Sequence, residues 1–401
     1  MKNKHHKINK SGLADLIRSA HMIGAASVAE AADTDSVDSF PALTLAKLKL
    51  ANLLTAGIDV KYGGLNLGLV PGTNLALLTI LKNIGKGNLV MGRVLEGHLN
   101  AQILISQFGD KKQKKLFAAD AFDGKLFGVW NTQAEDGTFL SKKGKGIYYL
   151  DGAKTFATGT GYVNRPIVTA AMEDGSWQMC VVPLDKSTVI SDSAWWHPMG
   201  MKASRSFKMT FLTTPISKIN LLGSAGEYYL QPGFSGGAVR FAAVQLGAAE
   251  KLLDETKEYL TNLNRTQDPF QRMRLGQMAI AVESGNQWLN AAAVRMDRYM
   301  EQPTADEGER FIIYANMMRT AIEQICTEVM ALCQKCVGAR GLNAPYHFER
   351  IIRDLSTYLR QPAPDAVLAD VGGHILQSGT PAGEIWNLNF NKKKKNESGK
   401  F

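Results

Sequence analysis

The chain has 401 residues, of which 45% are hydrophobic and 21% charged, a composition typical of a folded protein with two or three domains and a sizeable core. It contains no run of about 18 apolar residues, so the sequence predicts no membrane-spanning helix. The net charge of +9 lies almost entirely in residues 1–10 and 391–401, which carry +4 each; with a nearly neutral body between them, nucleic-acid binding is not expected.

Residues 1–12 are predicted to be a disordered basic tail, followed by an N-terminal helical domain over residues 13–125. Proline and glycine break the helical pattern at Pro41, at Gly57 and at residues 63–64 and 71–72. Six leucines between positions 43 and 54 predict the apolar stripe of one buried helix. Residues 74–81, 94–108 and 116–122 predict three more helical segments.

The hydrophobic period changes at Leu126. Short runs rich in β-branched and aromatic residues follow, separated by turn residues at intervals of roughly ten. This pattern predicts a β-sandwich or barrel domain over residues 126–222.

A helical period returns at Gly223 and predicts a bundle over residues 223–385, with a basic disordered tail over 386–401. The bundle contains three long helices, a shorter one over residues 348–359 and another after Asp365. Thr304 and Glu307 are spaced as a capping box at the start of the third long helix. The fold class is therefore α+β, with helices, then a β-domain, then a helical bundle.

Residues 335–365 combine two glycines, Gly338 and Gly341, with an amphipathic helix that Pro362 and Pro364 terminate. The glycines allow backbone to approach a ligand closely, so the stretch predicts one wall of a cleft. The alternative is two loops around an ordinary surface helix.

Four cysteines do not form a disulfide framework in a chain of this length, which predicts a reducing compartment, the cytoplasm. Cys333 and Cys336 form a CxxC pair inside a helical pattern, without a second pair or a histidine nearby. We predict that they are small buried helix residues and that the chain has no metal site. Arg18 and His21 interrupt the segment after the basic N-terminus, so no signal peptide is expected.

Five motifs in this order resemble the acyl-CoA dehydrogenase superfamily over roughly 300 residues: GIDVKYGG (57–64), FGDKKQKKLFAADAFDGK (108–125), LDGAKTFATG (150–159), GMKASRSFKMTF with ISKINLLG (200–223), and VGARGLNAPYHFERIIRDL (337–355). The resemblance implies an oxidoreductase with a C-terminal four-helix bundle and FAD as cofactor. It also implies a small-molecule substrate, an acyl thioester, a homodimer or homotetramer, and an electron-transfer partner.

The resemblance also implies positions for the flavin. Trp130 and Thr132 fall where the family lines the flavin with strand backbone and a hydroxyl. Phe156 and Thr158 fall where an aromatic ring stacks on the isoalloxazine and a threonine meets its polar edge. The alternative is that Trp130 and Phe156 are core residues of the sheet.

Four more positions match contacts that the family makes across a dimer. Arg265 matches an arginine that reaches the FAD pyrophosphate of a neighbouring subunit, a role suited to a planar cation with several donors. Lys335, Gly338 and Arg340 match a loop that clasps the same FAD. A surface arginine at a helix end is the alternative for Arg265.

The family's catalytic glutamates are missing. The usual one lies just beyond the arginine–aspartate helix, where this chain has Pro362–Pro364, and the alternative one would fall near Gly237–Ala238. Removal of an α-proton from an acyl thioester needs a base within hydrogen-bond reach.

Other residues near these positions do not replace the glutamate. Arg360 stays protonated and Gln361 does not titrate. Asp365, Glu135 and His347 remain as alternatives, but nothing in the sequence places them over a substrate. The catalytic residues are therefore left unassigned.

Three functions are compatible with this pattern. Dehydrogenation of an acyl thioester with a relocated base comes first, because it is the superfamily's commonest chemistry. A reduced-flavin monooxygenase needs no such base, and a non-catalytic flavin-binding homologue is the third alternative.

Overall fold

The computed structural model describes residues 10–144 and 146–387 and divides the chain into two compact units, residues 1–361 and 362–401. In the second unit, the helix expected after Asp365 is present as α11 (Pro364–Gln377), followed by α12 (Ala382–Ile385). Most of the two predicted basic tails lies outside the described residues. No described helix is long and apolar enough to cross a membrane.

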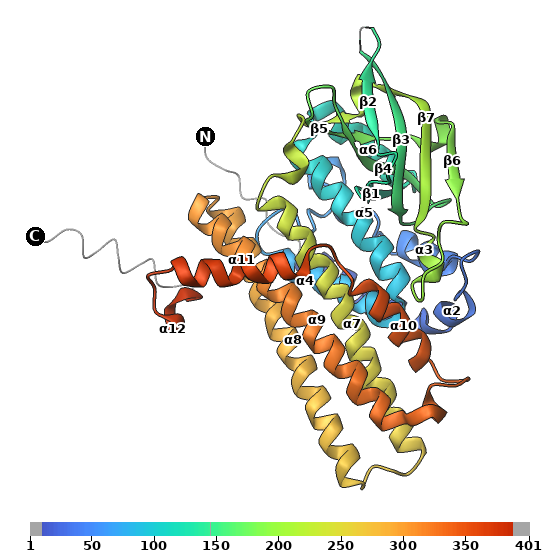
Figure 1. Cartoon of the computed structure of the whole chain (residues 1–401), viewed down its shortest axis with the longest axis vertical. Coiled ribbons are helices and arrows are strands. Elements are labelled where there is room, and N and C mark those ends of the chain that lie inside the picture. Colours follow the sequence, from blue (N-terminus) through green and yellow to red (C-terminus); the bar gives the residue numbers. More distant parts are fainter. Residues whose placement is uncertain (1–9, 145, 388–401) are drawn as a thin grey trace, which may run out of the picture. The chain divides into compact units, whose positions relative to one another are not determined.

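The first unit begins with helices, as predicted (Figure 1). Local signals explain where several begin: Asn88 caps α5, and Asp110 and Gln113 form a capping box at the start of α6. The elements are α1 (Lys10–Ala26), α2 (Val28–Asp33), α3 (Ala42–Leu50), η1 (Val60–Tyr62), α4 (Asn74–Gly87), α5 (Leu89–Phe108) and α6 (Lys111–Phe122).

The prediction of one buried leucine-rich helix over residues 43–54 is wrong. Helix α3 ends at Leu50, and its residues Leu43 and Leu50 are 68% and 84% exposed. Leu48 is buried inside the helix, whereas Leu53 and Leu54 are buried in the turns that follow. The leucine spacing continues with a helical period after Leu50, although α3 ends there.

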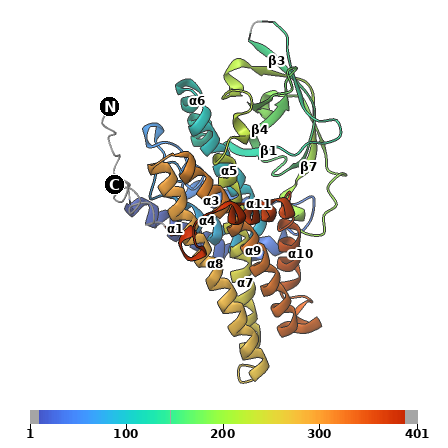
Figure 2. The ribbon, with the colours of Figure 1, turned by 60° about the vertical axis from the view of Figure 1, so that its left-hand side comes forward.

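The middle of the chain forms one eight-stranded sheet, which curves strongly (Figure 2). Its order is β6-β7-β3-β2-β4-β5-β8, and β1 pairs in parallel with β4. The runs GIYYLDG (146–152) and KTFATG (154–159) read as two strands in the sequence but form the single strand β3, and the short strands β2 and β8 are not predicted by the pattern. The strands are β1 (Leu126–Trp130), β2 (Phe139–Lys142), β3 (Ile147–Ala157), β4 (Val163–Ala171), β5 (Trp177–Val181), β6 (Val189–Asp192), β7 (Phe207–Ser217) and β8 (Leu221–Leu222).

The bundle follows the short helix η5 (Glu227–Tyr229). Asp268 caps α8 with Pro269 in its first turn. The predicted capping box at α9 is confirmed in part: the Thr304 side chain accepts the Glu307 N–H at 3.2 Å, whereas the Glu307 carboxylate accepts from Arg298 at 2.6 Å. Its helices are α7 (Gly233–Asn262), α8 (Pro269–Glu301), α9 (Ala305–Gly341) and α10 (Phe348–Tyr358).

Cys333 and Cys336 are buried free thiols on α9, as predicted. No group of three or more potential metal ligands occurs among the residues that the structure describes.

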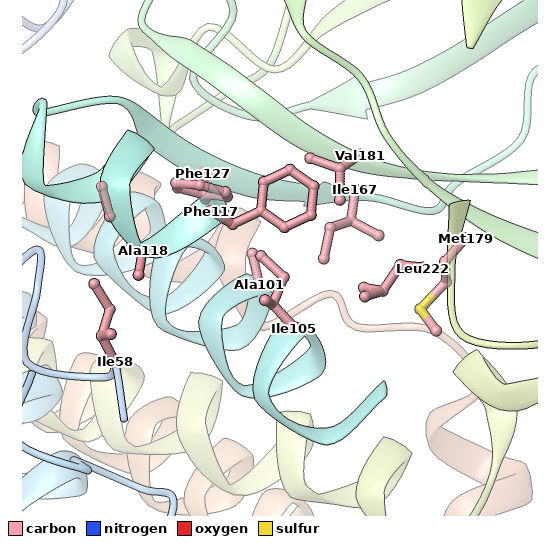
Figure 3. Close-up of a cluster of buried hydrophobic side chains, with 11 residues drawn as sticks. Ile58, Ala101, Ile105, Phe117, Ala118, Phe127, Ile167, Met179, Val181 and Leu222 are labelled. Carbon is pink, nitrogen blue, oxygen red and sulfur yellow. The ribbon is translucent and has the colours of Figure 1, made fainter. Parts of the chain in front are cut away.

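A hydrophobic cluster joins the sheet to the N-terminal helices (Figure 3). Phe127 of β1 packs against Phe117 of α6 and lies beside Ile105 of α5, with Ile167 and Val181 of the sheet in the same cluster. This packing fixes the position of α5 along β1, and both elements contribute to the candidate site.

His98 of α5 ties three segments together. Its Nδ1 accepts the Phe127 N–H at 3.0 Å, so Nε2 carries the proton and donates to the Leu54 carbonyl at 2.7 Å. The ring is fully buried, and burial lowers the pKa of His98 to about 4.

We expect the free energy of unfolding to fall by about 3 kcal/mol as pH drops from about 6.5 to about 4, because the unfolded chain then binds a proton that folded His98 excludes. Denaturant titrations across this range measure the change. His98→Gln should lower the stability at neutral pH and remove most of the slope, whereas His21→Gln, on the exposed face of α1, should keep it. An unchanged slope in His98→Gln would contradict this role.

Candidate active site

A pocket of about 210 Å³ lies where α5 meets β1 and the residues that follow β3. Arg93 and Gly97 line it from α5, Gly128 from β1, and Thr158 and Val163 from the sheet side. It therefore brings one predicted flavin residue, Thr158, next to a charged side chain of the N-terminal helices.

Phe156 forms an open aromatic shelf beside Thr158. It lies in an irregularity of the β3–β7 pairing, has a left-handed φ of 52° and is 51% exposed. The rings of Trp195 and Trp196 meet it edge-on, with centroids at 5.1 and 5.9 Å. A strained backbone that presents an apolar ring to solvent is typical of a ligand site rather than of a sheet core.

Hydroxyl groups lie next to this shelf. Thr158 Oγ1 is 2.9 Å from Ser206 Oγ, which is 2.8 Å from Ser204 Oγ. The tryptophan loop is fixed from the same region, because Trp196 Nε1 donates to the Lys202 carbonyl at 3.0 Å.

Helix α10 anchors the loop that carries the tryptophans. The Asp354 carboxylate accepts the Met201 N–H at 2.5 Å, the Thr357 hydroxyl accepts the Gly200 N–H at 3.0 Å, and Arg353 donates to the Met199 carbonyl at 3.0 Å. A Cβ at Gly200 would overlap the Arg353 carbonyl oxygen. The arginine–aspartate motif of the sequence thus has a structural role beside the shelf.

Trp130 and Thr132 both contact the end of β3 and the residues that follow it. Trp130 is 1% exposed and donates from Nε1 to the Thr158 carbonyl at 3.0 Å, so its side chain belongs to the core and supports the Thr158 turn. Thr132 is exposed, and its carbonyl accepts the Thr155 N–H at 3.1 Å. The Trp130 ring is therefore not available to stack on a ligand.

A buried lysine holds Asn131, between these two residues. Lys154 Nζ donates to the Asn131 carbonyl at 3.0 Å and to the Thr169 hydroxyl at 2.9 Å, and that hydroxyl donates to Asn131 Oδ1 at 2.7 Å. Tyr229 donates to the same Oδ1 at 3.0 Å. Burial lowers the pKa of Lys154 to about 7.

Helices α5 and α7 bury a charged cluster beside the pocket. Arg93 and Asn100 both donate to the Glu96 carboxylate. Arg240 of α7 donates from Nε to Asn100 Oδ1. Burial lowers the pKa of Arg240 to about 10, although Glu96 opposes the shift. Burial also acts against the charge of Arg93, but Glu96, Tyr358 and Tyr228 together outweigh it and raise the pKa of Arg93.

Two tyrosines border this cluster. The Tyr358 hydroxyl of α10 is buried and has no hydrogen-bond partner among the described residues. Burial, reinforced by Glu96, raises the pKa of Tyr358 well above its usual value. Burial also raises the pKa of Tyr228, with the charges of Glu96, Arg93 and Arg240 all within reach. No local pattern in the sequence predicts this cluster, because its members come from four separate segments.

Two family models cover most of the chain. The acyl-CoA dehydrogenase N-terminal domain matches residues 14–125, and the acyl-CoA dehydrogenase C-terminal domain matches residues 224–359. The chain belongs to the acyl-CoA dehydrogenase family.

Members with different activities are similar to this chain. An acryloyl-CoA reductase (NADH) from Anaerotignum propionicum is 24% identical over 82% of this chain and 84% of its own length. A dibenzothiophene monooxygenase from Mycolicibacterium goodii is 20% identical over 76% of this chain and 81% of its own.

Among solved structures, FMN-bound TdsC from Paenibacillus sp. A11-2 superposes with a TM-score of 0.81 at 17% identity, over 94% of this chain and 100% of the other. That likeness shows that the two chains share a fold. The relatives do not share one reaction, so the site must indicate which chemistry applies.

The family's two glutamate positions carry no carboxylate here. Gly237–Ala238 lie in the first turns of α7, and Pro362–Pro364 lie between α10 and α11. His347 is the N-cap residue of α10 without a side-chain cap, Glu135 is exposed in the β-domain, and Asp365 lies in the first turn of α11. Glu96 is the described carboxylate that contacts the pocket-lining Arg93.

The residues expected to clasp FAD across a dimer lie together, but not near Phe156. Arg265 follows α7, while Lys335 and Arg340 flank Gly338, where α9 breaks at φ 58°. Tyr259 links the two regions by donating to the Val337 carbonyl at 3.1 Å. All four are exposed. The turn between α7 and α8 and the C-terminal end of α9, which carry them, lie at the end of the bundle away from the sheet (Figure 1).

Proposed function

We propose that this protein is a flavin-dependent monooxygenase of the acyl-CoA dehydrogenase family, using reduced flavin and dioxygen on a small organic substrate. The observation that carries the proposal is the absence of a carboxylate at both positions where the family places its base, Gly237–Ala238 and Pro362–Pro364. Oxygenation requires no α-proton abstraction, whereas dehydrogenation does.

The residues present fit an isoalloxazine ring. Phe156 offers a half-exposed aromatic face, Trp195 extends the apolar wall, and the Thr158 and Ser206 hydroxyls can meet the polar edge of the ring. Reduced flavin would supply two electrons and activate dioxygen. The exposed Phe156 ring also disfavours the third alternative, a non-catalytic homologue.

The side chains beside the shelf suit substrate binding better than proton removal. Arg93 and Arg240 are cations that do not accept a proton, and Tyr358 is held neutral by burial. Arg93 lines the pocket that contains Thr158, and Arg240 and Tyr358 belong to the Glu96 cluster next to it. Their role is to bind and orient a substrate and to exclude water from the reacting atoms.

Dehydrogenation of an acyl thioester is the second candidate, and Glu96 favours it. Its carboxylate is 3% exposed and bonds to Arg93, which lines the pocket. A relocated base of this kind would have to release Arg93 and Asn100 before accepting a proton. This requirement ranks it below oxygenation.

The flavin is proposed to be FAD, because Arg265, Lys335, Gly338 and Arg340 match contacts to its pyrophosphate; FMN, seen in TdsC, is the alternative. These four residues lie away from the same chain's shelf, so the proposal includes a homodimer or homotetramer in which they reach a neighbour's flavin. An electron-transfer partner would then supply reduced flavin.

We expect the protein to bind reduced FAD or FMN at least tenfold more tightly than the oxidised form, and the bound reduced flavin to consume oxygen. Anaerobic titration followed by mixing with aerated buffer measures both, and free flavin is the control. Bound oxidised flavin that bleaches anaerobically with butyryl-CoA would instead establish dehydrogenation. A protein that takes up neither form would overturn the flavoenzyme proposal.

A further inference from the structure

Arg240 is a buried cation without a carboxylate in contact. Its side chain is 6% exposed, and the one hydrogen bond it makes to the described residues runs from Nε to Asn100. Its two terminal nitrogens therefore have no partner in the described part of the chain. Neither nitrogen is among the described side-chain atoms that are both fully buried and unbonded, so both keep some contact with solvent and a ligand can reach them.

Other unused donors lie within electrostatic reach of Glu96, as Arg240 does. Arg93 makes one bond to the described residues, from Nη1 to Glu96, which leaves its remaining N–H groups unpaired at the pocket wall. The buried Tyr358 hydroxyl has no partner within residues 10–144 and 146–387. Asn100 is already used, because it donates to Glu96 and accepts from Arg240.

The small residues at the start of α7 leave room beside Arg240. A Cβ added at Gly237 would meet no atom within 4 Å, and a Cβ at Gly236 would lie 3.2 Å from Arg240 Nη1. On this side of the guanidinium, α7 therefore presents glycine backbone and no side chain.

The charges of the cluster do not balance. Among the described residues, Glu96 is the one carboxylate whose charge acts on Arg93 and Arg240, so two guanidinium groups face one carboxylate and leave +1. One added monoanion would neutralise the site and accept the unused N–H and O–H donors.

We propose that Arg93, Arg240 and Tyr358 bind a monoanionic oxyanion group of the substrate, a carboxylate or a sulfinate, and hold it beside the flavin shelf. Arg93 also lines the pocket that contains Thr158, so an anion bound there places the rest of the molecule toward the shelf. This inference rests on the proposed function in one respect, that the bound anion is called a substrate. Binding of the anion itself does not depend on turnover.

Isothermal titration of the purified full-length protein tests this without any reaction. The probes are propionate and propane-1-sulfinate against the neutral isostere propionamide, at constant ionic strength in chloride. We expect each oxyanion to bind at least tenfold more tightly than the amide, because only the anion pairs with both arginines. The tighter of the two anions identifies the chemistry of the group.

Arg240→Met should weaken propionate binding at least tenfold, and Arg240→Lys should weaken it less, since lysine keeps the charge but not the planar fork. Lys251→Met removes a partly buried cation from the same helix outside the cluster and should leave binding unchanged. Circular dichroism checks that each variant folds. If Arg240→Met does not fold, the comparison of propionate with propionamide on the wild-type protein still tests the site.

Equal binding of propionate and propionamide, no binding of either anion, or unchanged propionate binding in a folded Arg240→Met would overturn the site. Flavin uptake and oxygen consumption are measured separately. If they fail while propionate binds, the anion site stands and the proposed function falls; the reverse result removes the anion site alone.

Discussion

Asp354→Ala is expected to lower the free energy of unfolding by about 3–5 kcal/mol and to abolish tight flavin retention. Asp354 is 3% exposed, accepts the Met201 N–H at 2.5 Å and lies 3.5 Å from the guanidinium of Arg350, which is 7% exposed. Removing the carboxylate leaves a buried cation without its counter-charge and a backbone donor without its acceptor.

The same change should release the loop before the shelf. Met201 follows Gly200 and the tryptophan pair, so the loss of its anchor lets Trp195 and Trp196 move away from Phe156. Denaturant unfolding measures the stability, and equilibrium dialysis with flavin measures retention.

Two variants calibrate the Asp354 result. Asp354→Asn keeps an oxygen for Met201 and should cost less, whereas Asp254→Ala removes a half-exposed carboxylate in a surface pair with Lys86 and should cost at most about 1 kcal/mol. If Asp354→Ala proves as mild as Asp254→Ala, the anchoring role assigned to Asp354 is wrong.

The order of the modules could be predicted because it depends on period alone. The helical spacing before Leu126 and after Gly223, and the short β-rich runs between them, correspond to the observed helices and strands. The capping spacing at Thr304 was also sufficient to locate the start of α9. These signals are local, so the sequence carries them directly.

Strand boundaries and helix ends were less predictable. Strand β3 runs through Gly152 and the irregularity before Ala157. Gly152 reads as a turn residue in the sequence, and the positive φ of Phe156 has no signal there. Similarly, the leucines after Leu50 continue a helical spacing although α3 has ended. Pairing with β7 keeps β3 continuous, and burial against other elements determines where the leucines after α3 lie. Neither can be recognised from a few neighbouring residues in the sequence.

The charged cluster could not be predicted, because it depends on three-dimensional proximity. Arg93 and Glu96 are three residues apart and read as an ordinary surface pair on a helix, while Arg240 lies in a glycine- and alanine-rich segment. The one available signal was a lone arginine among small residues at the start of α7. The positions of Phe156 and Thr158, in contrast, came from the family resemblance.

Phe156→Ala is expected to weaken flavin binding by about 2 kcal/mol, or roughly 30-fold, because it removes one stacking face and its apolar contact area. Its ring is 51% exposed, so the substitution leaves no cavity and the unfolding transition should change little. Phe156→Trp should keep most of the affinity. Dialysis against oxidised and reduced flavin measures each variant.

Phe139→Ala is the matched control, since Phe139 is 39% exposed on the same sheet, at the start of β2, and has no ring contact with Trp195 or Trp196 among the described residues. The φ of 52° at Phe156 sharpens the comparison, because the backbone strain persists in the alanine variant and only the ring is lost. Equal flavin affinity in Phe156→Ala and Phe139→Ala would mean that the isoalloxazine lies elsewhere. The strained bulge would then need a role in folding the tryptophan loop, which Asp354→Ala tests independently.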